Sequence, residues 1–153
     1  MTARCADAFA EQARQTPHTH TLPQLSIPAE VNYIGAFLTL ECNLACAYCI
    51  NDPSQAGCRK GLFAGDGMSP SDWVRGLARL PVSADLPITL QGGEPMIYRG
   101  GRGVADILAG SEHWFDLLTN LVVKSERVIE ALAPNAAKLR RQAPYPSVRV
   151  SYH

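Results

Sequence analysis

The chain has 153 residues, a length that fits one domain, and 46% of them are hydrophobic, which is enough for a core. Fourteen basic and fourteen acidic residues cancel, so nothing suggests a long-range attraction to nucleic acid or an anionic membrane. No apolar run approaches the ~20 residues of a membrane helix, and residues 1–10 lack the apolar region of a secretory signal. We therefore expect a cytoplasmic protein without nucleic-acid or membrane partners.

The first 30 residues are predicted to form a flexible N-terminal extension. Residues 16–23 are polar and contain prolines, and Pro28 adds another break. We interpret His18 and His20 as incidental residues of this arm rather than as metal ligands.

After this extension the apolar pattern alternates between strand and helix. Val31–Leu40 is rich in β-branched and aromatic residues, and its continuous apolar character predicts a buried strand. Ser69-Pro70-Ser71-Asp72 then predicts a helix start, with Ser69 as the N-cap and an acid three residues later. Apolar residues follow at helical spacing, and Pro81 ends this helix.

The same alternation continues to the last residues. Leu86–Leu90 and Trp114–Thr119 are predicted strands, separated by a short helix that Gly110 closes. Residues 125–141 are predicted to be helical in two pieces, and Val148–Tyr152 is the fourth strand. Strand–helix alternation at this spacing predicts an α/β domain over residues 31–153, with parallel strands joined by right-handed crossovers.

Three of the five cysteines lie within eight residues. Cys42, Cys46 and Cys49 form the pattern C-x3-C-x2-C directly after the first strand. A secreted disulfide scaffold would use an even, more widely spaced set, so the clustering indicates metal or redox chemistry. Three thiolates are too few for a structural zinc site, which takes four ligands. They suit a four-iron cluster whose fourth iron is left to another ligand.

A second motif, Gln91-Gly92-Gly93-Glu94-Pro95, follows the second predicted strand. Two glycines allow the backbone to approach a ligand closely. The Glu94 carboxylate offers an acceptor for an ammonium group. By itself this segment also fits an ordinary turn.

Together the two motifs resemble those of the radical S-adenosylmethionine (SAM) superfamily, in which C-x3-C-x2-C carries an aromatic residue before its last cysteine and a GGEP motif follows. Tyr48 occupies the aromatic position. The resemblance implies a parallel-stranded partial (β/α) barrel, usually of six strand–helix units. This chain supplies about four strands and three crossovers, so we expect an incomplete barrel: a fragment, a truncated reading frame or a half that needs a partner.

The resemblance also implies cofactors and partners. Cys42, Cys46 and Cys49 would hold a [4Fe–4S] cluster, and S-adenosylmethionine would chelate its open iron. One electron would cleave SAM to a 5′-deoxyadenosyl radical that removes hydrogen from a substrate. A reductant such as flavodoxin or ferredoxin would supply the electron. The substrate is unknown, and the sequences of the two motifs resemble those of peptide- and protein-modifying maturases.

In that reading, several residues would surround SAM. Glu94 would contact the SAM ammonium, with Gly92 and Gly93 shaping the same pocket, and Tyr48 would lie near the adenine. Asn120 and Ser151 stand where relatives often place polar SAM contacts, although each also fits a strand-end cap. All of these residues are expected at the carboxyl ends of parallel strands, where α/β folds gather their sites.

Other candidates are weaker. Cys58 is interpreted as a free thiol in a loop rather than a fourth zinc ligand, and Cys5 as incidental. Gly100–Gly103 lacks the full dinucleotide fingerprint. His113 is expected to serve packing or capping. The alternative function is a cluster- or zinc-binding module without SAM chemistry of its own.

Overall fold

The structure, a computed structural model, describes residues 23–49, 67–123, 125–141 and 146–151, and its center is one parallel sheet. Four strands pair in the order β1-β2-β3-β4, and every pairing is parallel. The strands are β1 (Ile34–Phe37), β2 (Ile88–Gln91), β3 (Phe115–Thr119) and β4 (Val148–Val150). The connecting helices are α3 (Pro70–Leu77), 3₁₀ helix η1 (Pro95–Gly101), α4 (Gly103–Gly110), α5 (Ser125–Leu132) and 3₁₀ helix η2 (Ala133–Lys138). The predicted parallel α/β architecture is confirmed.

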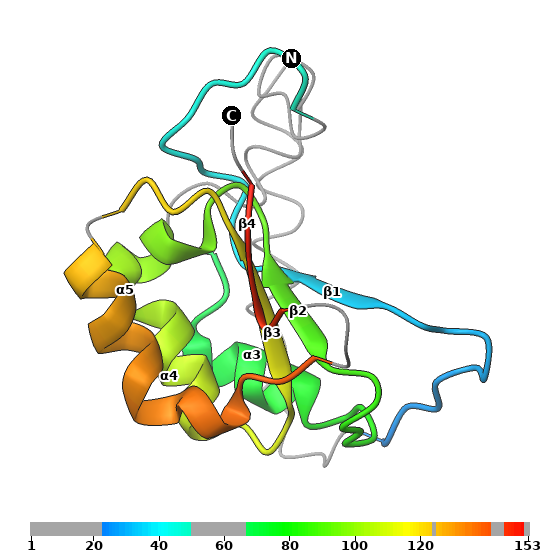
Figure 1. Ribbon diagram of the computed structural model, residues 1–153. Helices are drawn as coiled ribbons and strands as arrows, with labels where there is room; N and C mark the ends of the chain where they lie inside the picture. Colours follow the sequence, from blue (N-terminus) through cyan, green and yellow to red (C-terminus); the bar gives the residue numbers. More distant parts are fainter. Residues whose placement is uncertain (1–22, 50–66, 124, 142–145, 152–153) are drawn as a thin grey trace, which may run out of the picture.

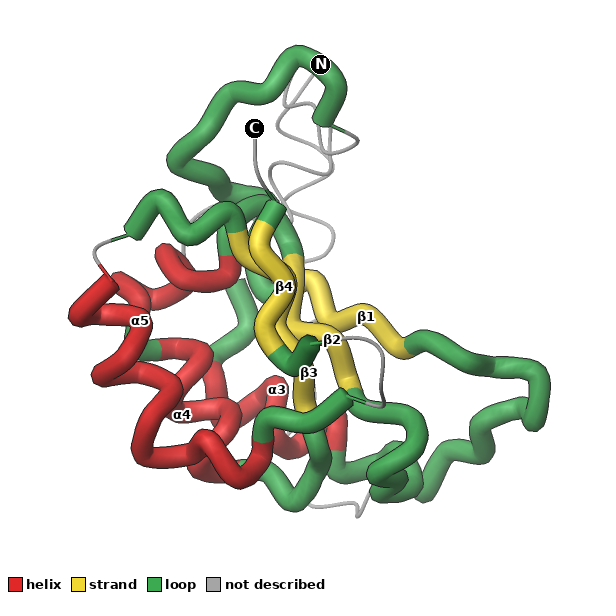
Figure 2. Tube along the Cα trace, viewed as in Figure 1, coloured by secondary structure: helices red, strands yellow, loops and turns green. Residues whose placement is uncertain are grey.

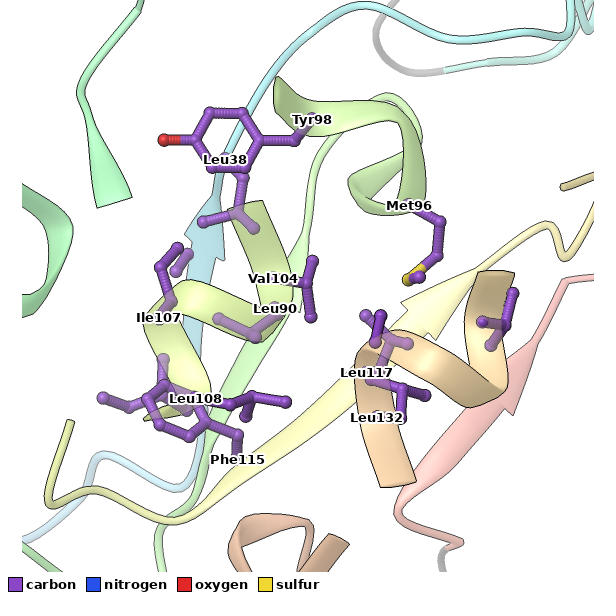
Figure 3. Packing of buried hydrophobic residues seen from close by; sticks show 14 of the residues in the cluster. Leu38, Leu90, Met96, Tyr98, Val104, Ile107, Leu108, Phe115, Leu117 and Leu132 are labelled. Carbon is purple, nitrogen blue, oxygen red and sulfur yellow. The ribbon is translucent and has the colours of Figure 1, made fainter. Parts of the chain in front are cut away.

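The α-helices lie together on one side of the sheet (Figures 1 and 2). Alternate strand residues such as Leu90 and Leu117 point to that side and are completely buried. They pack against Val104, Ile107 and Leu108 of α4, and Figure 3 shows this contact from close by. We call this side the helix-covered face and the opposite side the helix-free face.

The strands differ from the prediction in length. The first strand was predicted over residues 31–40 and forms only over 34–37, at an edge of the sheet. Its expected burial is partly wrong, because Gly35 and Tyr33 are exposed on the helix-free side while Ala36 is buried. The fourth strand ends at Val150, so Ser151 follows it, although the Ser151 N–H still donates to the Thr119 carbonyl at 2.9 Å.

The described part of the N-terminal extension is attached to the end of α3. The Leu25 N–H donates to the Arg79 carbonyl at 2.7 Å, and the Arg79 guanidinium donates back to the Pro23 carbonyl at 3.1 Å. The earlier residues of the predicted flexible arm, including His18 and His20, lie outside the described residues. None of the described helices is long and apolar enough to cross a membrane.

The N-terminus of α3 is capped as the sequence predicts. The Ser69 hydroxyl accepts from the Asp72 N–H at 3.1 Å, and the Asp72 carboxylate accepts from the Ser69 N–H at 3.3 Å. The hydrogen bond from the Ser69 hydroxyl, supported by the nearby Arg75 guanidinium, holds the pKa of Asp72 below its usual value. Because the pKa is lowered on folding, the carboxylate stabilises the fold above its unfolded-state pKa and loses this effect as pH falls through the folded value.

We predict that Ser69→Ala lowers the free energy of unfolding by about 1 kcal/mol at pH 7, as loss of a helix cap does. The penalty should shrink below about pH 4, where Asp72 becomes protonated in the unfolded and then in the folded chain. Urea unfolding of both proteins between pH 3 and pH 7 measures this. A penalty that is constant over the range would contradict the role of the carboxylate.

Candidate functional site

The cysteine-bearing loop directly follows β1 and rises above the carboxyl ends of the strands (Figure 1). Cys42 is exposed, Cys46 and Cys49 are half-buried, and all three are free thiols. The Cys49 N–H donates to the Cys46 carbonyl at 3.1 Å, which closes a turn around the x2 segment. The Leu44 N–H points at the Cys42 sulfur at 3.4 Å.

Two asparagines join this loop to the residues after β3. The Asn120 side-chain amide donates to the Asn43 side-chain oxygen at 2.8 Å and lies 3.6 Å from the Cys42 sulfur. The Asn43 amide in turn donates to the Val122 carbonyl at 3.0 Å. We call the edge formed by the carboxyl ends of the strands, together with the loops that follow them, the rim of the sheet. The sequence therefore placed Asn120 correctly at this rim, and the structure gives it a direct contact with the first cysteine.

The two glycines of the GGEP motif make close contact with the segment that leads into the cysteine loop. The Gly93 N–H donates to the Thr39 carbonyl at 2.7 Å, and the Glu94 N–H donates to the Glu41 carbonyl at 2.8 Å. A Cβ atom on Gly92 would lie 2.2 Å from the Thr39 oxygen, and one on Gly93 would lie 2.0 Å from the Glu41 oxygen. The close approach predicted for a ligand is thus made, within the described residues, by backbone next to Cys42.

Glu94 is completely buried, and its carboxylate joins the start of η1 to the end of β3. Oε1 accepts from the Met96 N–H at 2.8 Å and from the Thr119 hydroxyl at 2.6 Å. Oε2 accepts from the Asn120 N–H at 2.7 Å. These bonds use three of the roughly four lone-pair positions of a carboxylate, and the position that remains is on Oε2.

A pocket of about 320 Å³ lies between the cysteine loop and the ends of β3 and β4. Its polar lining comes from Cys46, Asn120 and Ser151, and its apolar lining from Leu44, Ala45, Val122 and Val150. Three residues predicted from separate parts of the sequence therefore share one pocket of the size that binds small molecules. Tyr48 does not line it, and 70% of its surface is exposed.

Three cysteine thiols on one loop are the donor set that a [4Fe–4S] cluster with one open iron would use. Among the described residues, no three His, Cys, Asp or Glu side chains are arranged to hold one ion. The ligands of a four-iron cluster bind different irons and need not converge on one point. Three thiolates, one of them contacted by two N–H donors, suit a cluster with one open iron.

The remaining candidates lie away from this rim. His113 is buried, and its Nε2 is 2.8 Å from the Leu77 carbonyl, so it serves packing between β3 and α3. Gly100 and Gly101 adopt positive φ at the kinked C-terminal end of η1. Cys5 and Cys58 lie outside the described residues.

Sequence reasoning missed Asn43 at the site and, outside it, the buried Asp116 of β3. Asn43 was not singled out, although an amide side chain directly after the first cysteine of the motif is a usable signal. Asp116 was also missed, and a charged residue inside a buried strand, as in WFDLLT, marks a position that needs a partner.

Comparison with known proteins adds no relative. No family model, no curated protein and no solved structure matches the chain. The interpretation of the site therefore rests on the motifs and contacts of this chain.

We predict that Gly93→Ala lowers the free energy of unfolding by roughly 2–4 kcal/mol, because its Cβ would collide with backbone rather than with a side chain that can rotate away. The matched control is Gly76→Ala in α3, where a Cβ meets nothing within 4 Å. That variant should be unchanged or up to about 1 kcal/mol more stable. Equal effects in urea unfolding would contradict the close approach at Gly93.

We predict that Glu94→Gln destabilises the fold by about 1–3 kcal/mol, since a glutamine amide cannot accept from all three donors and leaves a buried N–H or O–H unpaired. Glu112→Gln is the control, because Glu112 is exposed and close in sequence to β3. Chemical denaturation of the two variants measures the difference. A Glu94 variant as stable as the control would show that the carboxylate does not join the segments.

Proposed function

We propose that the chain is a radical SAM protein that binds a [4Fe–4S] cluster through Cys42, Cys46 and Cys49 and binds SAM beside it. The observation that carries the proposal is that the C-x3-C-x2-C loop, the Gly-Gly-Glu turn and Asn120 are joined by hydrogen bonds at one end of a parallel sheet. Each motif alone is common. Their assembly at one end of the sheet, beside a pocket that Cys46, Asn120 and Ser151 line, supports a shared cofactor site.

The residues of the rim would have separate tasks. When bound, the cluster supplies one electron that cleaves the SAM sulfonium, and the resulting radical removes hydrogen from the substrate. Asn43 and Asn120 hold the cysteine loop against the end of β3. The Asn120 amide near the Cys42 sulfur also provides a hydrogen-bond donor, which is one of the contacts that set a cluster's potential.

The proposed SAM contacts divide into exposed and buried groups. Asn120 and Ser151 line the pocket and would bind polar groups of SAM there. Glu94 would accept from the SAM ammonium through Oε2, but this carboxylate is completely buried, so the contact requires the turn at Gly92 and Gly93 to open. Tyr48, exposed at the rim, would move over the adenine.

The finer fold belongs to the same proposal. Four parallel strands in sequential order, with the helices on one face, are the arrangement expected of part of a (β/α) barrel. The helix-free face would then be the barrel interior. A reductant such as flavodoxin or ferredoxin would approach the exposed cysteine loop. The amino-acid sequence of the two motifs favours a peptide or protein as the substrate.

One observation favours a second candidate, a cluster- or zinc-binding module without SAM chemistry. The Glu94 carboxylate already accepts from three donors within the described residues, so its role there is to connect segments of the fold. This candidate predicts metal binding that SAM does not alter.

We predict that the anaerobically reconstituted chain binds about four irons with matching sulfide. Cys42→Ala, Cys46→Ala and Cys49→Ala should each lose most of this iron, because each removes the sole thiolate on one iron. Cys58→Ala is the matched control and should keep it. Iron analysis and absorption spectra measure both sets. Zinc in place of iron, lost in Cys58→Ala, would contradict the proposal and support a four-cysteine zinc site.

A further inference from the structure

The helix-free face of the sheet carries a row of polar side chains across three strands. In the register of the sheet, Thr89 of β2 lies beside Asp116 of β3, and Leu118 of β3 lies beside Arg149 of β4. Because side chains alternate between faces, Asp116 and Arg149 share the helix-free face. Thr89 and Asp116 are completely buried there, although neither belongs to the apolar core.

Two arginines converge on the buried carboxylate. Arg141 and Arg149 both contact Asp116 Oδ2, Arg149 at 3.4 Å and Arg141 more closely. Both also lie near the Thr89 hydroxyl, at 3.4 Å for Arg141 and 3.3 Å for Arg149. Within the described part of the chain, Arg149 shares Asp116 Oδ2 with the closer Arg141, so Asp116 balances the charge of Arg149 incompletely.

Two atoms of this cluster are buried without a hydrogen-bond partner among the described residues: Asp116 Oδ1 and Arg149 Nε. A buried polar atom without a partner destabilises the fold, and more so when the group is charged. Asp116 Oδ1 is an acceptor and Arg149 Nε is a donor. The two groups are held next to each other by the contact between Asp116 Oδ2 and Arg149 Nη2. The arginine side chains are 17% and 26% exposed, whereas Asp116 Oδ1 and Arg149 Nε are buried, so a ligand that bonds to these two atoms requires the arginine side chains to move aside.

We propose that this cluster binds the hydroxycarboxylate group of a small-molecule ligand. The carboxylate of the ligand would accept from Arg149 Nε and supply the missing negative charge, and the adjacent hydroxyl would donate to Asp116 Oδ1. A plain carboxylate satisfies only the first requirement, and an amine only the second. Arg141 fixes the Asp116 carboxylate and positions it.

Strand alternation places Arg149 and Ser151 on the same side of their segment, and Asp116 and Asn120 on the same side of theirs. Arg149 lies two residues before Ser151 on one extended segment, about 7 Å along the strand. Asp116 lies four residues before Asn120, about 13 Å. A ligand held by its acid group at Arg149 would therefore extend toward the pocket that Ser151 and Asn120 line. Identifying this ligand as the substrate rests on the proposed function, but the binding itself does not.

The test is a titration of the isotopically labelled full chain, as purified and without iron, followed through the Arg Nε–H signals in nitrogen–proton correlation spectra. The Arg149 signal is assigned by its absence in Arg149→Lys. Glycolate is the probe, and acetate is the matched acid that lacks the hydroxyl. The Arg75 signal serves as an internal control, because that side chain is 72% exposed on α3.

We predict a saturable shift of the Arg149 signal with glycolate and about tenfold or more weaker binding of acetate, the effect of one hydrogen bond to a charged group. The Arg75 signal should move only slightly and without saturation. In Arg149→Lys, which keeps the charge and loses the planar fork, binding is followed through the Arg141 Nε–H signal, and most of the affinity should be lost. Equal response to both acids, or an Arg149 signal that behaves like Arg75, would overturn the proposal. Because no iron is present, failure of cluster assembly leaves this result unaffected.

Discussion

The hydrogen bonds accepted by the buried Glu94 carboxylate hold the segments at the carboxyl ends of the strands together. A charge with no exposed surface is stable only when donors surround it, and Glu94 accepts from the Met96 N–H, the Thr119 hydroxyl and the Asn120 N–H. Its own N–H is bonded to the Glu41 carbonyl, next to the first cysteine. One residue thus joins the segments after β1, β2 and β3. The glycines before it are needed because the joined backbones lie too close for a Cβ atom.

The same alternation of side chains that builds the core gives the sheet two chemically different faces. On the helix-covered face, apolar residues such as Leu90 and Leu117 pack against the helices. On the helix-free face, Asp116 and Arg149 stand where a structural sheet would carry apolar or solvated residues. The order of side chains along β3 and β4 leads from this charged cluster to Asn120 and Ser151. A ligand bound at the cluster would therefore extend toward the cysteine loop.

Much of this architecture was predictable because it rests on local patterns. The order of strands and helices follows from periodicity, and the Ser69 cap follows from four residues. Burial of the first strand was only partly predictable, since a pattern does not show which strand lies at an edge. The rim position of Asn120 was predictable from strand ends. The burial of Glu94 and its bond to Thr119 were not, because they join residues 25 positions apart. The ion pair of Asp116 with Arg141 and Arg149 depends on register in the same way.

The central claim is that three cysteines hold a cluster with one iron open to SAM. Electron paramagnetic resonance of the anaerobically reconstituted, dithionite-reduced chain, recorded with and without SAM, tests it most directly. The account predicts a [4Fe–4S]⁺ signal whose shape and position change when SAM is added, because a new ligand reaches the open iron. A cluster signal that SAM leaves unchanged would contradict a working cofactor pocket and support the metal-binding module. Absence of any cluster signal, with zinc bound instead, would contradict the radical SAM assignment itself.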